Sequence, residues 1–101
     1  MAYVPGGLSV KTDTLSHGGP REWILQGSDA VTTVRGANYI SDAEARGMRA
    51  GDLVYYIQWT TFTDQYTFTA PIVAYQLMPV LTVASTGADL GDGTAIDITN
   101  T

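Results

Sequence analysis

The chain has 101 residues, enough for one domain around one hydrophobic core but not for two. Only 15% of its residues are charged, against about 25% in an average globular protein, and acidic residues outnumber basic ones by ten to five. The net charge of −5 and the scattered basic residues argue against nucleic-acid binding, which requires clustered Lys and Arg. The absence of cysteine excludes disulfides and thiolate metal sites.

The sequence shows neither a membrane span nor a signal peptide. No apolar run approaches the length that crosses a bilayer, and no basic segment followed by an apolar one stands near the start. We therefore expect a soluble protein that is made in a cytosol. Its low charge leaves two interpretations open: surfaces that contact other protein molecules, or an uncharged β domain that relies on threonine for solubility.

Residues 1–7, MAYVPGG, are expected to form an extended arm ahead of a single β-rich domain at residues 8–101. Pro5 fixes its own φ angle and disfavours helix at Val4. From Leu8 to Thr12, apolar and polar residues alternate with the period of a half-buried strand. An arm of this kind is often ordered only when it lies across a neighbouring molecule.

Two short helices are expected in the middle of the chain. Ser28 and Asp29 are candidates for capping a helix over Ala30–Val34, because their side-chain oxygens accept hydrogen bonds from a first turn. The β-branched residues in that helix limit it to one or two turns. Ser41–Glu44 has the capping-box pattern, and Gly47 suits the left-handed position that follows a helix.

Short apolar segments separated by turns make up the rest of the chain. Leu53–Trp59 is a continuous apolar and aromatic run after a Gly51-Asp52 turn, which is typical of a strand covered on both faces. Tyr66–Thr69 alternates and is expected to pair with it through a hairpin loop. The predicted strands are Leu8–Thr12, Glu22–Gln26, Leu53–Trp59, Tyr66–Thr69, Ile72–Leu77, Val80–Ala84 and Ala95–Thr99. This pattern predicts a mainly β fold, a small sandwich or barrel of about six to seven short strands with one or two short helical insertions.

The sequence contains no pattern that predicts a catalytic residue, a cofactor or a metal. His17 is the one histidine, so a histidine-based metal site cannot be built within one chain. Asp42 and Glu44 are two residues apart and diverge on a helix, which does not suit paired carboxylate chemistry. The acidic residues near the C-terminus are Asp89, Asp92 and Asp97. They lack the ligand spacing of an EF-hand, so turn formation is the better interpretation, and a weak Ca²⁺ site between subunits stays open. We therefore predict that the protein is not an enzyme.

Several segments resemble a known family. They are a Gly-Leu pair near the start, a Gly18-Gly19 loop before the strand with Trp23, the central run DAVTTVRGANYISDAEARGMRAGDLV, and the C-terminal DGTAIDITNT. In these segments the chain resembles short virion proteins of tailed bacteriophages, described as head decoration, cement or head-fibre proteins. The segment from Gln58 to Leu77 departs from that pattern.

The resemblance implies a structural role on a phage particle, commonly as a trimer seated on the capsid. It implies the major capsid protein as the partner. It also implies that the protein is made in the host cytoplasm and lies on the capsid surface of the virion. The position on the particle stays open between the capsid, the fibre base and the tail. We expect contacts through the arm and through exposed aromatics of the predicted hairpin. These residues are Tyr3, Val4, Pro5, Leu8, Trp59, Phe62 and Tyr66. The alternative is a fibre, receptor-binding or glycan-binding module that uses Trp59 and Tyr55 as platforms.

Overall fold

The structure is a computed structural model that describes residue 3, residues 5–12 and residues 20–98, with the backbone alone at residues 11 and 12. Its strands are β1 (Leu8–Thr12), β2 (Glu22–Gly27), β3 (Leu53–Gln58), β4 (Ala74–Ala84), β5 (Gly87–Leu90) and β6 (Thr94–Ala95). Its helices are α1 (Val31–Val34) and α2 (Ala43–Arg46), with 3-10 turns η1 (Pro5–Gly7) and η2 (Phe62–Tyr66). The prediction of a small, mainly β domain of about six strands with short helical insertions is confirmed.

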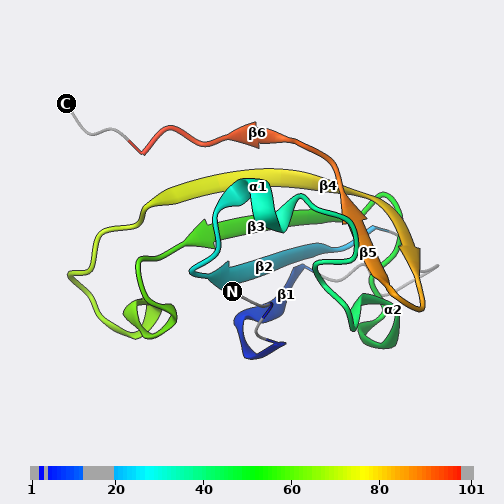
Figure 1. Ribbon diagram of the computed structural model, residues 1–101, viewed down its shortest axis with the longest axis horizontal. Coiled ribbons are helices and arrows are strands. Elements are labelled where there is room, and N and C mark those ends of the chain that lie inside the picture. The colour runs from blue at the N-terminus through cyan, green and yellow to red at the C-terminus, as the bar shows by residue number, and fades with distance from the viewer. Residues whose placement is uncertain (1–2, 4, 13–19, 99–101) are drawn as a thin grey trace.

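The strands form one six-stranded mixed sheet in the order β1-β2-β3-β4-β5, with β6 also paired to β4 (Figure 1). β2 and β3 are parallel, and every other pair is antiparallel. A parallel pair cannot be joined by a tight hairpin, so residues 28–52 form a crossover that carries α1 and α2. Residues 74–79 of β4 pair with β3, and from Val80 onward β4 pairs with β5, which turns away from the direction of the other strands (Figure 1).

The hydrophobic core lies between one face of the sheet and the crossover. Burial alternates along β2 and β3, where Trp23, Leu25, Val54 and Tyr56 are all at most 2% exposed. The residues that pack over them from the crossover and β5 are Val34, Ile40, Ala43, Met48, Ala88 and Leu90. We call this side of the sheet the inner face.

A buried carboxylate joins three strands on the inner face. Asp52 is 1% exposed, and its side chain accepts hydrogen bonds from the backbone N–H groups of Arg21 and Arg49 and from Nε1–H of Trp23, each at 3.0 Å. Its backbone carbonyl accepts from the N–H of Val80 at 2.8 Å. One residue therefore ties the starts of β2 and β3 to the middle of β4. The sequence predicted only a turn at this position.

The N-terminal helix caps predicted at Ser28 or Asp29 and at Ser41 are wrong, because other residues hold the N-cap positions. The N-cap residues are Ala30 and Asp42, and neither makes a side-chain capping hydrogen bond. The carboxylate of Asp29 instead accepts from the hydroxyl of Tyr39 at 2.5 Å, and that of Asp42 accepts from Tyr3. The C-terminal prediction is confirmed, because Gly47 ends α2 with φ 91°.

Two strand predictions are also wrong. Tyr66–Thr69 is not a strand: η2 ends at Tyr66, and β3 pairs instead with β4. The carboxylate of Asp64, which accepts the N–H of Thr61 at 3.1 Å, favours this 3-10 turn. The two strands predicted on either side of Pro79 are a single strand. Pro79 is tolerated because it lies where β4 changes partner from β3 to β5, so the sheet needs no N–H from it.

We predict that Asp52→Asn destabilises the protein by about 2–3 kcal/mol, because an amide presents an NH₂ group to donors that a carboxylate satisfies with two oxygens. Urea unfolding at pH 7 measures the difference. The matched control is Asp92→Asn, whose side chain is 88% exposed and which we expect to change the stability by less than about 0.5 kcal/mol. Equal, small effects of the two variants would contradict the role given to Asp52.

Candidate interaction surface

The second face of the sheet, here called the outer face, is apolar and only half-buried. In β3, Leu53, Tyr55 and Ile57 point away from the core and are partly exposed, while Val54 and Tyr56 between them are buried. The cross-strand register places Ile24 and Leu77 on either side of Tyr55, and Tyr75 beside Ile57. The outer face thus consists of Ile24, Leu53, Tyr55, Ile57, Tyr75 and Leu77.

This arrangement corrects the prediction that β3 is covered on both faces. The crossover residues that join the core, Val34 of α1 and Ala43 of α2 among them, pack with the inner-face side chains. Both helices therefore cover the same side of the sheet, and Figure 1 shows α1 in front of β3 and β4. Among the described residues, no helix or second sheet covers the outer face.

The polar ends of two outer aromatics are satisfied within the chain. The hydroxyl of Tyr55 donates to Oε2 of Glu22 at 2.7 Å, and this hydrogen bond raises the pKa of Tyr55. Trp59 follows β3, and its Nε1–H donates to Oε1 of Gln26 at 2.9 Å. Neither ring needs a polar partner outside the chain, so both suit a contact that is mainly apolar.

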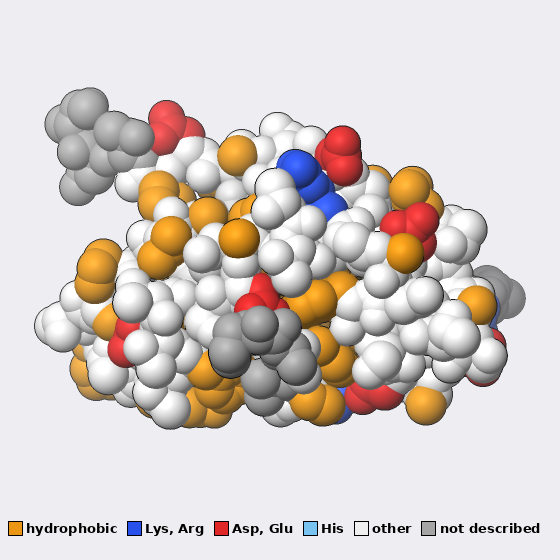
Figure 2. All heavy atoms as spheres, in the orientation of Figure 1, with side chains coloured by type: hydrophobic (Ala, Val, Ile, Leu, Met, Phe, Trp, Pro, Cys, Tyr) orange, Lys and Arg blue, Asp and Glu red, His pale blue; other side chains and the backbone are white. Residues whose placement is uncertain are grey.

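A loop rich in aromatic residues lies at one end of the sheet. We call residues 60–73, between β3 and β4, the aromatic loop. Phe62 and Tyr66 meet edge to face at 6.4 Å between ring centroids, which holds η2 together. Tyr66 is 70% exposed and Phe68 is 104% exposed. At the left end of the molecule in Figure 2, where η2 and the start of β4 lie, hydrophobic side chains are interspersed with polar atoms and an acidic side chain, and no lysine or arginine is visible.

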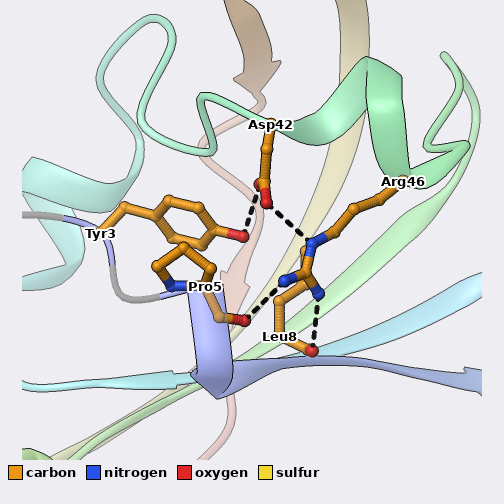
Figure 3. Close-up of polar contacts among 5 residues, drawn as sticks. All are labelled: Tyr3, Pro5, Leu8, Asp42 and Arg46. Carbon is orange, nitrogen blue, oxygen red and sulfur yellow. Dashed lines mark hydrogen bonds and ion pairs between the residues drawn. The ribbon is translucent and has the colours of Figure 1, made fainter.

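A second polar cluster fastens the N-terminal segment to α2 (Figure 3). The hydroxyl of Tyr3 donates to Oδ1 of Asp42 at 2.6 Å, and Arg46 pairs with Oδ2 of the same carboxylate at 2.8 Å. The guanidinium of Arg46 also donates to the carbonyls of Pro5 at 3.0 Å and Leu8 at 3.1 Å. We call these five residues the N-terminal latch. The described part of the predicted arm therefore lies on its own domain.

Two tyrosines and one aspartate in this region have altered acidity. Burial and the hydrogen bond to Asp42 raise the pKa of Tyr3, and burial and the hydrogen bond to Asp29 raise the pKa of Tyr39. Burial opposes ionisation of Asp42, but the hydrogen bonds from Tyr3 and Arg46 outweigh it and hold the pKa of Asp42 below its usual value. The carboxylate is therefore ionised at neutral pH, as the latch requires.

The predicted contact residues fall into two groups. The first group belongs to the predicted arm and the start of β1 and lies near α2: Leu8 is buried, Tyr3 is half-buried and Pro5 is exposed. Val4 lies outside the described residues. The predicted contacts near the aromatic loop are Trp59 and Phe62, which are half-buried, and Tyr66, which is exposed. The two groups adjoin at Gly7, where an added Cβ would come within 3.0 Å of the Phe62 ring. Sequence reasoning missed Phe68, which lies between exposed threonines, and the outer-face residues Ile24, Tyr75 and Leu77. These three lie beside buried residues on β2 and β4, so the two-residue period of a strand was a usable signal.

The described residues offer little to hold a small ligand. They enclose no pocket and contain no group of three or more His, Asp or Glu side chains placed to bind a metal. Asp92, one of the clustered acids near the C-terminus, lies 3.6 Å from the guanidinium of Arg35, and His17 lies outside the described residues. No helix of the described chain is long and apolar enough to span a membrane. No family model, curated protein or solved structure matches the chain.

We predict that Tyr3→Phe lowers the stability at pH 7 by about 1 kcal/mol, because it removes one hydrogen bond to a partly exposed carboxylate. The pKa of Asp42 is lower in the folded state, so its contribution is complete above about pH 4 and is lost as the pH falls through the folded value. The difference between the two proteins should therefore shrink below about pH 4. Urea midpoints at several pH values measure it.

The matched control is Tyr66→Phe, which removes an equivalent hydroxyl from an exposed position. We expect it to leave the stability nearly unchanged at every pH. If Tyr3→Phe destabilised the protein equally at neutral pH and well below pH 4, the hydrogen bond to ionised Asp42 would not be its cause.

Proposed function

We propose that this protein is a structural component of a tailed-phage particle, a decoration or cement protein that binds the major capsid protein and stabilises the head. The observation that carries the proposal is the aromatic loop, in which Tyr66 is largely exposed and Phe68 is fully exposed. The resemblance of the segments around Trp23, Ser41–Met48 and the C-terminus to phage virion proteins supports the same role. The low charge of the chain suits a surface that contacts protein.

The proposed mechanism is burial of apolar surface that is gained only in the assembled shell. Removing a side chain such as Phe68 from water contributes about 1.5–3 kcal/mol. Each copy that seats its aromatic loop between neighbouring capsid subunits adds such burial to the assembled state and none to free subunits. By mass action, binding to the assembled shell shifts the equilibrium away from disassembly.

The proposal assigns no catalytic step to the chain. The two buried carboxylates and the half-buried Asp42 each have a structural partner: Asp29 accepts from Tyr39, Asp42 from Tyr3, and Asp52 from Trp23. Carboxylates that act as general acids or bases must be free to exchange a proton with a substrate. These three acids instead join elements that are far apart in the sequence.

We predict that Phe68→Ser lowers the affinity for capsid shells at least about tenfold, because one exposed phenylalanine that becomes buried contributes about 1.5–3 kcal/mol. Co-sedimentation of the purified protein with shells that lack it measures the affinity. The matched control is Leu81→Ser, which removes an apolar side chain that is 53% exposed and lies outside the loop. Undiminished binding of Phe68→Ser would remove the aromatic loop from the proposal.

A second candidate is a fibre or receptor module that binds glycans. The observation that favours it is the pair of half-exposed rings of Tyr55 and Trp59, whose polar ends are already bonded, as in a platform for stacking. Because Trp23 is 2% exposed, quenching of tryptophan fluorescence by added sugars would report on Trp59. We expect this module to show saturable quenching that Trp59→Phe abolishes. A flat response across a panel of sugars would exclude it.

A further inference from the structure

The outer face is apolar, and no second layer of the described chain packs on it. Sheets that pack stably bury their apolar faces against another layer, and a continuous apolar strand such as β3 is typical of burial on both sides. The structure buries only the inner side. We propose that a second copy of this chain packs on the outer face and supplies the missing layer. This inference goes beyond the proposed function, and it does not depend on a phage shell.

The size of the outer face fits a weak contact between two copies. Strands about 4.8 Å apart with a rise of about 3.3 Å per residue give this side of the sheet roughly 400 Å² of flat area, with the outer-face residues of β2 to β4 at its centre and β1 and β6 at its edges. Two copies would then bury roughly 800 Å², which is the size of a weak contact and about half the ~1,600 Å² of a standard interface. We therefore expect association that depends on concentration.

The distribution of charge allows two copies to meet on this face. Glu22 is the one charged residue among the described outward-facing positions of β2, of β3 and of the part of β4 that pairs with β3, and its carboxylate already accepts from Tyr55. A second acid, Asp89, is partly exposed on β5, which turns away from the direction of those strands. The acids Asp29, Asp42 and Asp52 lie on the crossover side, and Arg35 and Asp92 pair with each other. Two molecules of net charge −5 can thus join their outer faces while most of the repelling groups stay apart.

The chemistry of the face also favours an identical surface over a charged partner. Ile24, Ile57 and Leu77 offer no group that would recognise a specific polar ligand, and the polar tips of Tyr55 and Trp59 beside them are bonded within the chain. Flat apolar faces of sheets pack on one another at about 10 Å, as the two layers of a sandwich do. A second copy of the chain carries the same flat apolar face, so it can form the second layer of such a packing.

Sedimentation velocity over a wide range of protein concentrations tests the inference. For the wild-type chain we expect the mass to rise from one copy to two as the concentration increases. Ile57→Lys, which places a charge in the middle of the outer face, should stay monomeric at every concentration. Ile57→Thr keeps the β-branched shape and should weaken the association about tenfold or more, so the test remains decisive if the lysine variant fails to fold.

The matched control is Thr32→Lys, which adds the same charge at an exposed position of α1 on the opposite side of the sheet and should associate like the wild type. Circular dichroism and thermal melting establish that each variant is folded. A wild type that is monomeric throughout, or an association that the Ile57 variants leave unchanged, would overturn the inference. Shell binding is measured separately, so a chain that self-associates without binding shells keeps this inference and loses the proposed function.

Discussion

The fold depends on a buried carboxylate at the start of a parallel strand pair. The side chain of Asp52 accepts hydrogen bonds from the backbone N–H groups of Arg21 and Arg49 and from the indole N–H of Trp23. Its backbone carbonyl accepts one from the N–H of Val80. Removing any one of these donors would leave a buried charge less well compensated, which is costly in a protein interior. The contact sets where β2 begins relative to β3, and so it sets the register of the parallel pair. Because such a pair requires a crossover, Asp52 also determines where residues 28–52 must pass over the sheet.

The position of that crossover explains the two surfaces of the molecule. Its helices and its buried residues, Ile40 and Met48 among them, fill one side of the sheet and leave the other side apolar and half-exposed. The chain between β3 and β4 does not fold back as a strand, and its exposed rings at Tyr66 and Phe68 extend from the end of the sheet. A chain of this length has few residues with which to cover both faces. The uncovered surface is where oligomerisation and partner binding would contribute stability.

The sequence predicted the elements whose signals are local, and failed where a distant partner decided the outcome. β1 follows from alternation, β3 from its apolar run, and the left-handed Gly47 from glycine geometry. The cap predicted at Asp29 failed because the hydroxyl of Tyr39, ten residues away, donates to its carboxylate. The capping box predicted at Ser41 failed because Asp42 is the N-cap residue of α2, and its carboxylate accepts from Tyr3, 39 residues away. The strand predicted at Tyr66–Thr69 failed because Asp64 stabilises a 3-10 turn and β4 pairs with β3. The outer face was visible as the apolar run of β3, but which of its sides stays open depends on the crossover, which no local pattern specifies.

Hydroxyl-radical footprinting with mass spectrometry tests the central claim, that the outer face and the aromatic loop are two surfaces with different partners. Oxidation of side chains would be compared in dilute protein, in concentrated protein and in protein bound to shells. We expect Tyr75 and Leu77 to become protected as the concentration rises without shells, and Tyr66 and Phe68 to become protected only when shells are present. Equal oxidation of Tyr75 and Leu77 under all three conditions would contradict the claim, since the outer face would then stay uncovered.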